Sequence, residues 1–340
     1  MSQPAVEAKA EDLSQEVSRF GTDFRRLQAE IAKEVVGYQE IVERVLTCLF
    51  SGGHCLLEGV PGLGKTLLVR TLSQALDVSF SRVQFSPDLM PADIVGTNVL
   101  VISDEGQKTF RFEKGPIFAN VVLADEINRA TPKTQAALLE AMQEHAVTAG
   151  GTRYSIEEPF FVLGTQNPID MEGTYPLPEA QVDRFLFKLH VGYLGEEELL
   201  TVIDRTTSTA KAVIEPVLSP ERIHAMRHLV RQVAVAEHVK RTAVRLARAT
   251  QPTNDAAPDA IKRYVKFGAS PRGILSLILG GKVRALLDGR THLACEDLRA
   301  VFKPALRHRV ILNFEGEAEH KTSDELLDAV LEAVPDTATE

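Results

Sequence analysis

Short apolar runs alternate with helical segments over the first part of the chain. Five such runs, each five or six residues long, consist mainly of leucine, β-branched and aromatic residues. Between them, apolar side chains recur at the spacing of one helix face, as at Leu68, Leu72 and Leu76. Strands separated by helices predict an α/β fold, with a parallel five-stranded sheet covered by helices on both faces. The predicted strands are residues 54–58, 80–85, 121–125, 160–165 and 186–191.

Further helices are predicted upstream of the first strand and after the third. The last of them begins with Thr131, a favourable N-cap residue, and then Pro132, whose fixed φ suits the first helical position. These predicted helices are residues 24–32, 38–50 and 131–145.

Two stretches interrupt the alternation of strands and helices. Residues 99–103 and 109–113 alternate apolar and polar side chains around Asp104-Glu105-Gly106, a sequence typical of turns. Residues 147–156 show a similar pattern around Gly150-Gly151. We therefore predict two β-hairpins inserted into the α/β core.

The composition changes after Gly192. Residues 196–310 are rich in Ala, Leu, Arg and Glu, show almost no strand pattern and are interrupted by prolines, which predicts an all-helical second domain. Residues 323–334 have the spacing of one amphipathic helix. The predicted organisation is a flexible extension (1–23), either a mobile tail or a loose helix, followed by an α/β core (24–192), a linker (193–214), a helical domain (215–313) and an acidic tail (314–340).

Composition and charge narrow the class of protein. The chain has 340 residues, is 44% hydrophobic and carries a net charge of −9. Such an acidic chain is a poor match for nonspecific nucleic-acid binding, which favours a basic excess. No apolar run is long enough to span a bilayer, and the N-terminus lacks the pattern of a signal or transit peptide. Because Cys48, Cys55 and Cys295 have neither metal-site nor disulfide spacing, we expect a cytoplasmic protein without membrane insertion.

The strongest chemical signal is a phosphate-binding loop. Residues 59–66 read Gly-Val-Pro-Gly-Leu-Gly-Lys-Thr and match the pattern Gly-x-x-x-x-Gly-Lys-Thr. They lie between a predicted strand and a predicted helix, and this context is required because loop N–H groups and the helix N-terminus together bind phosphate. Lys65 would supply a positive charge, and Thr66 a hydroxyl for Mg²⁺. The predicted nucleotide-binding residues here are Gly59, Pro61, Gly62, Leu63, Gly64, Lys65, Thr66 and Leu67.

Two consecutive acids form the second signal. The predicted strand 121–125 ends in Asp125, and Glu126 follows it. At this place the first carboxylate can hold the Mg²⁺ shell together with Thr66, and the second can orient and activate a water molecule. Acids at strand ends are common in themselves, but a pair downstream of a phosphate loop predicts a nucleotide hydrolase.

Together these motifs resemble the AAA+ ATPases, and further segments resemble the MoxR branch of that family. The resemblance covers about residues 24–313 and implies an AAA+ αβα core with a smaller helical lid domain. It also implies that the two hairpins face the central pore of a ring. The segments that carry it are residues 127–130 (Ile-Asn-Arg-Ala), 164–168 (Gly-Thr-Gln-Asn-Pro), 172–185 and 268–273 (Gly-Ala-Ser-Pro-Arg-Gly).

The resemblance assigns roles to residues outside the phosphate loop. Asn167 corresponds to sensor 1, which positions the attacking water. Arg184 corresponds to the arginine finger, which reaches the γ-phosphate of ATP bound by the neighbouring subunit. Val36 and Gly37 match the segment that lines the adenine pocket. Whether Arg129 also acts on a neighbour stays open.

Arg272 corresponds to sensor 2. Ser270 and Pro271 have the residue types of an N-cap and a first helical position, so Arg272 is expected in the first helical turn, aimed back across the domain cleft. A cation is unfavourable at a helix N-terminus, so this position requires an anionic partner.

The resemblance implies that the protein assembles into a hexameric ring. The ring would hydrolyse ATP with Mg²⁺ to remodel or mature a protein partner, as a chaperone does. Related ATPases work with a von Willebrand factor A domain, which here would act in trans because the chain lacks an Asp-x-Ser-x-Ser motif.

Three alternative functions share the phosphate loop. A nucleic-acid motor of the helicase type is disfavoured because acidic residues offset Lys108 and Arg111 on the first hairpin. A small-molecule phosphotransferase leaves Asn167, Arg184 and Arg272 without a common purpose. A non-catalytic module gated by ATP is the remaining alternative.

Overall fold

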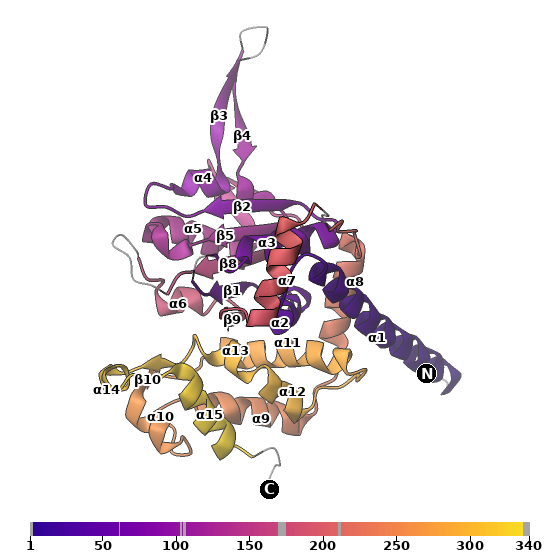
Figure 1. Cartoon of the computed structure of the whole chain (residues 1–340), viewed down its shortest axis with the longest axis vertical. Coiled ribbons are helices and arrows are strands. Elements are labelled where there is room, and N and C mark those ends of the chain that lie inside the picture. The colour runs from indigo at the N-terminus through magenta and orange to yellow at the C-terminus, as the bar shows by residue number, and fades with distance from the viewer. Residues whose placement is uncertain are drawn as a thin grey trace.

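The computed structural model describes residues 3–60, 62–102, 104, 107–168, 175–209 and 212–335. Its centre is a five-stranded parallel sheet in the order β2-β5-β8-β1-β9 (Figure 1). The prediction of a parallel five-stranded sheet is therefore confirmed. The strands are β1 (Cys55–Glu58), β2 (Phe80–Gln84), β5 (Val121–Asp125), β8 (Phe161–Gln166) and β9 (Phe187–His190).

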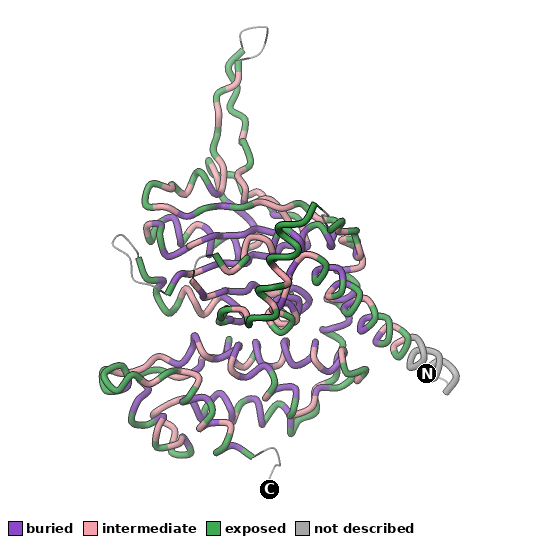
Figure 2. Tube along the Cα trace, viewed as in Figure 1, coloured by how far each residue is buried: buried purple, intermediate pink, exposed green. Residues whose placement is uncertain are grey.

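Helices cover both faces of this sheet, because alternate strand residues point to opposite sides. Leu57 and Leu123 belong to a large apolar core shared with the first three helices, whereas Leu56 and Val122 belong to a second core beneath α5. The central strands are almost wholly buried (Figure 2). The helices concerned are α1 (Gln3–Ala32), α2 (Gln39–Ser51), α3 (Lys65–Ala75) and α5 (Pro132–Glu144).

The predicted flexible extension, residues 1–23, is wrong for the part whose side chains are described. Helix α1 runs without a break through the predicted boundary at residue 23. Val17 and Phe20 are buried, and the Phe20 ring contacts those of Phe24 and Phe50. The physical reason is that Val17, Phe20 and Phe24 share one helix face, so an apolar stripe continues upstream within a polar composition.

The predicted linker, residues 193–214, contains a helix. Helix α7 (Glu196–Thr207) has no buried residue, yet it is fixed to the core because Arg205 donates hydrogen bonds to the carbonyl oxygens of Ala32 and Lys33. Within the described part of the chain, no helix combines the length and apolar character needed to cross a bilayer.

The second domain is mostly helical, as predicted, but not entirely. A short antiparallel ribbon joins β10 (Val265–Phe267) to β11 (Ile311–Leu312). The domain also continues into the predicted acidic tail, because Leu326, Leu327 and Val330 of α15 are buried. Its helices are α8 (Pro220–Gln232), α9 (Glu237–Arg248), α10 (Asp259–Tyr264), α11 (Pro271–Leu287), α12 (Cys295–Ala300), α13 (Phe302–Leu306), α14 (Phe314–Ala318) and α15 (Ser323–Ala333).

Both predicted hairpins form. Strands β3 (Gly96–Ile102) and β4 (Lys108–Lys114) make a ribbon that projects from the core after the short helix α4 (Pro91–Val95) (Figure 1). The second hairpin pairs β6 (Ala146–Ala149) with β7 (Thr152–Ser155). The two hairpins touch where Phe112 stacks on Tyr154, with ring centroids 4.1 Å apart. Of the predicted first turn, Glu105 and Gly106 lie outside the described residues.

Candidate functional site

The phosphate loop connects β1 to α3. Gly62 and Gly64 have φ angles of 86° and 75°, a left-handed conformation that glycine adopts without strain. A Cβ at either position would meet no atom within 4 Å, so the space above the loop is open. At Gly59, in contrast, a Cβ would lie 2.7 Å from the Val191 carbonyl oxygen, so this glycine permits close packing on the chain after β9. Pro61, predicted as part of the loop, lies outside the described residues.

Lys65 begins α3 and turns back toward the loop. Its Nζ donates a hydrogen bond to the Gly59 carbonyl oxygen at 2.6 Å. Burial lowers the pKa of Lys65, and the negative charges of Asp125, Glu126 and Glu58 oppose that shift. The lysine is thus a partly desolvated cation surrounded by carboxylates. A phosphate oxygen can replace the Gly59 carbonyl as its partner.

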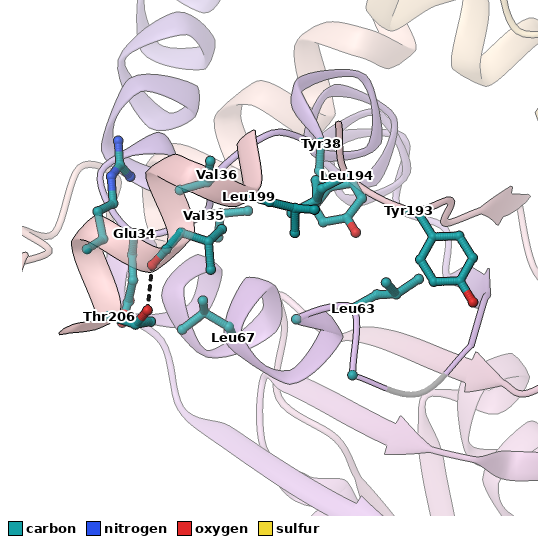
Figure 3. Close-up of a pocket in the computed structure, with 14 residues that line it drawn as sticks. Glu34, Val35, Val36, Tyr38, Leu63, Leu67, Tyr193, Leu194, Leu199 and Thr206 are labelled. Atoms are coloured by element: carbon teal, nitrogen blue, oxygen red, sulfur yellow. Dashed lines mark hydrogen bonds between the residues drawn. The ribbon is translucent and has the colours of Figure 1, made fainter. Parts of the chain in front are cut away.

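A cavity of about 240 Å³ adjoins the loop (Figure 3). Val36, which the resemblance assigns to the adenine segment, lies in its wall. Gly37 has a φ of 67°, and a Cβ there would lie 2.6 Å from Leu194, so glycine allows the chain after β9 to close over this segment. The walls are largely apolar and come from Val35, Val36, Tyr38, Leu63, Leu67, Tyr193, Leu194, Leu199 and Val202.

Asp125 is buried at the end of β5, and both of its carboxylate oxygens have partners. Thr165 Oγ1 donates to Oδ1 at 2.6 Å. Arg82, on the neighbouring strand β2, forms an ion pair with Oδ2 at 2.8 Å. The carboxylate is therefore fixed in orientation before any metal ion binds.

Glu126 follows directly and adopts a left-handed conformation with φ of 56°. Its Oε2 accepts hydrogen bonds from Gln84 Nε2 at 2.9 Å and from Arg129 Nη1 at 2.8 Å. Its backbone N–H donates to Thr165 Oγ1 at 2.8 Å. These bonds hold the carboxylate beside β2.

Asn167 follows β8 at the same edge of the sheet. It is buried, and its carbonyl oxygen accepts a hydrogen bond from Asn128 Nδ2 at 3.2 Å. Because β1, β5 and β8 are neighbouring parallel strands, their carboxyl ends bring the phosphate loop, the two acids and Asn167 to one edge.

Arg184 and Arg272 lie elsewhere. Ser270 caps α11 and Pro271 occupies its first turn, as predicted, but the Arg272 guanidinium lies 3.6 Å from the carboxylate of Asp183. Arg184 comes next in the chain and donates a hydrogen bond to the Leu139 carbonyl oxygen at 2.6 Å.

Residues 183–186 directly precede β9. The Leu186 N–H donates a hydrogen bond to the His54 carbonyl oxygen, which lies just before β1. These residues therefore lie at the edge where the strands begin, opposite the phosphate loop. Arg272 of the lid reaches back to Asp183 of the core, which supplies the expected anionic partner, but this contact lies away from the phosphate loop of the same chain. No lid residue of the described chain lines the nucleotide cavity.

Comparisons with known proteins agree with this arrangement. Residues 54–187 match the ATPase family associated with various cellular activities (AAA), and residues 257–330 match an AAA lid domain. The chain is 41% identical to chaperone MoxR1 of Mycobacterium tuberculosis over 334 residues, which cover 97% of this chain and 86% of that protein. The chain belongs to the MoxR family of AAA+ ATPases.

Two further relatives support the assignment. Protein MoxR of Methylorubrum extorquens is 33% identical and matches 92% of this chain and 96% of its own length. A crystal structure of a candidate ATPase from Cytophaga hutchinsonii superposes with a TM-score of 0.89 at 38% identity, covering 97% of this chain and 98% of that one. The similarity to AAA+ proteins with a core and a lid therefore extends over nearly the whole chain.

The described residues fit a nucleotide with Mg²⁺. Open space lies above Gly62 and Gly64, a cation stands beside that space at Lys65, and an apolar cavity suited to a base adjoins it. Thr66 in the first turn of α3 and Asp125 are the oxygen donors that a hard cation prefers.

Sequence reasoning missed three residues of this MoxR-type site: Arg82, Gln84 and Thr165. A signal for the first two was present, because polar side chains two residues apart on a strand share one face. Recognising it required the pairing of β2 with β5, which sets Gln84 opposite Asp125.

Proposed function

We propose that the chain hydrolyses ATP to ADP and phosphate at a site completed by a second copy of itself. The supporting observation is that the predicted site residues are divided between two edges of one sheet. Lys65 and Asp125 lie where the strands end. Arg184 and Arg272 lie where the strands begin. Strands of four to six residues span about 13–20 Å, too far for an arginine to reach its own phosphate loop.

Within one copy, each residue has a separate role. Loop N–H groups and Lys65 hold the β- and γ-phosphates, and Asn167 helps position the attacking water. Glu126 takes the proton as the water oxygen bonds to the γ-phosphorus and the bond to the ADP oxygen breaks. Thr66 and Asp125 would hold Mg²⁺, which neutralises phosphate charge when bound.

The second copy supplies its arginines. Guanidinium groups from Arg184 and Arg272 stabilise the charge spread over the phosphoryl oxygens, an effect worth about 10³–10⁵ in rate for arginine fingers. Contact between unlike edges is head-to-tail, and such contacts close into a ring when the rotation allows. We propose a hexamer.

The macromolecule acted on is proposed to be a protein. The relative from Mycobacterium tuberculosis is named a chaperone, and the β3–β4 hairpin exposes Leu100, Ile102 and Phe110, which suit apolar segments of a client. Lys108 and Arg111 are the cations near the described end of this hairpin, and so few cations would bind the phosphates of a nucleic acid only weakly. A von Willebrand factor A domain in trans is a second proposed partner. Because the three cysteines are free, the compartment is proposed to be cytoplasmic.

Glu126→Gln provides the direct test of the chemistry. The variant should bind ATP as the wild type does but release phosphate at least about 100-fold more slowly, because the water loses its general base. Binding of a fluorescent ATP analogue and phosphate release measure the two effects. The ATP-loaded variant should also retain a protein client in a pull-down. Phosphate release at the wild-type rate contradicts the role of Glu126, and salt-sensitive stimulation by DNA contradicts the choice of a protein client.

A further inference from the structure

Two exposed strips on this chain are complementary in charge and in apolar character. The first, the lid strip, consists of Lys266 and Phe267 of β10 together with Arg272 and Leu275 of α11, which begins four residues after Phe267. Phe267 is 61% exposed and Leu275 is 59% exposed, although both are large apolar residues. Leu275 lies one helical turn after Arg272 on α11, so the strip continues the surface that carries the sensor arginine.

The second, the α7 strip, consists of Glu196, Leu200, Ile203 and Asp204. These residues follow the spacing i, i+4, i+7 and i+8, so they form one helix face. Leu200 and Ile203 are 50% and 54% exposed. A different face of α7, with Leu199, Val202 and Thr206, lines the nucleotide cavity (Figure 3). The helix thus covers the nucleotide site with one face and leaves an apolar, acidic face in solvent.

The β10 end of the lid strip is well separated from α7 (Figure 1). Strand β10, which ends in Phe267, lies at the left of the lid in Figure 1, below the short helix α6 (Glu179–Val182), whereas α7 crosses the right half of the core. The apolar residues of both strips are exposed, so the strips do not cover one another within one chain. They can pair between copies, as a head-to-tail contact requires.

We propose that the lid strip of one copy docks on the α7 strip of the next copy. Phe267 and Leu275 cover Leu200 and Ile203, while Lys266 faces the acidic residues. This inference rests on the proposed function, because docking here would bring Arg272 of one copy beside the nucleotide cavity covered by α7 of the next. It explains why α7 has no buried residue in the single chain. The contact would therefore couple the position of α7 over the nucleotide cavity of one copy to the placement of Arg184 and Arg272 from the other copy.

Two charge substitutions test the docking. Phe267→Asp places an acid against Glu196 and Asp204, and Ile203→Asp buries a charge at the centre of the contact. Each should weaken association of the copies by about tenfold or more, because central apolar anchors dominate such interfaces. Sedimentation velocity with ATPγS and Mg²⁺ measures association. The matched control is Val244→Asp on the outer face of α9, which should assemble as the wild type does.

A mixture of the two variants gives the sharper test. At a concentration near the wild-type dissociation constant, each alone should remain mostly monomeric, but together they should form a dimer, because the Ile203→Asp chain keeps an intact lid strip and the Phe267→Asp chain an intact α7 strip. The dimer should hydrolyse ATP in one pocket, that of the Phe267→Asp chain. Adding Arg184→Ala to the Ile203→Asp chain should abolish this hydrolysis, while adding it to the other chain should have no effect.

The outcomes separate the two proposals. Assembly of either single variant at wild-type concentrations, or no dimer on mixing, overturns the docking. A dimer whose hydrolysis is indifferent to Arg184 supports the docking and overturns the shared active site. A wild-type chain that stays monomeric with nucleotide overturns both.

Discussion

At the residue scale, both acids of the site are restrained by side chains of strand β2. Arg82 pairs with Asp125, and Gln84 donates to Glu126. Arg82 also donates to Gln84 at 2.8 Å, so one connected network spans both acids. The guanidinium of Arg82 neutralises part of the Asp125 charge that would otherwise attract a metal ion. Mg²⁺ binding must therefore compete with Arg82.

Arg82→Ala should raise the apparent affinity for Mg²⁺ in the presence of ATP. The side chain of Arg82 is about half exposed, so the gain should be modest, about two- to fivefold. Titration of Mg²⁺ against a fluorescent ATP analogue measures the shift. Arg82→Lys, which keeps the charge, is the matched control and should stay close to wild type. Equal Mg²⁺ affinity in wild type and Arg82→Ala would contradict the competition.

The strengths and limits of the sequence are visible at individual residues. Lys65, Asp125 and Glu126 could be predicted because short contiguous motifs fix their positions relative to one strand end. The partner of Arg272 could not, because it depends on how helix α11 of the lid packs beside Asp183 of the core. The role of Arg82 depends equally on a strand pairing that single-sequence periodicity does not specify.

At the element scale, long periodic segments were predictable and short or atypical ones were not. The five strands and α5 follow clear apolar patterns. The β10–β11 ribbon has only three and two residues, too few for a period-2 pattern. The packing of the first part of α1 on the core was not predicted, only a mobile tail or a loose helix, because its buried residues are sparse among charged ones although they share one face.

Phe20→Ala tests the revised assignment of α1. Phe20 is fully buried against Phe24 and Phe50, so truncation should lower the free energy of unfolding by about 3 kcal/mol or more. Urea denaturation measures this change. Its control is Arg19→Ala on the exposed side of α1, expected to stay within about 0.5 kcal/mol of wild type. If Phe20→Ala lowers the free energy of unfolding no more than Arg19→Ala does, this part of α1 does not contribute to the core and the revised assignment is wrong.

Helix α8 is fixed to the core through Glu158. This carboxylate pairs with Arg227 of α8 at 2.7 Å and with His145 after α5. Burial opposes ionisation of Glu158, but hydrogen bonds from His145 and the Phe160 N–H and the charge of Arg227 outweigh it, lowering the pKa of Glu158 to about 2. A lowered pKa stabilises the fold above the ordinary value of 4.5, and this stabilisation is lost as the pH falls toward 2.

Glu158→Gln should therefore destabilise the protein near pH 7 by about 2 kcal/mol, a value reduced for the partial exposure of Glu158. The difference from wild type should shrink as the pH falls from about 4.5 toward 2. Urea denaturation at several pH values measures it. A difference that stays constant across this range would contradict an electrostatic origin.

At the scale of the whole molecule, the sheet separates the two halves of the proposed active site. One edge carries the phosphate loop and both acids, and the other carries Arg184 and Arg272 beside Asp183. In the proposed mechanism, neither half is complete within one copy. Sequence motifs named the phosphate loop, both acids and the two arginines, and the strand order places the arginines at the opposite edge of the sheet from the loop.

The most direct test of this account mixes Glu126→Gln chains with Arg184→Ala chains. Each variant alone should be nearly inactive, because one lacks the general base and the other lacks the arginine in every site. In an equal mixture, pockets that keep Glu126 and meet a neighbour with Arg184 are complete, so phosphate release should recover to about one quarter of the wild-type rate. If the mixture releases phosphate no faster than the two variants measured separately, ATP is not hydrolysed between copies and the central claim is wrong.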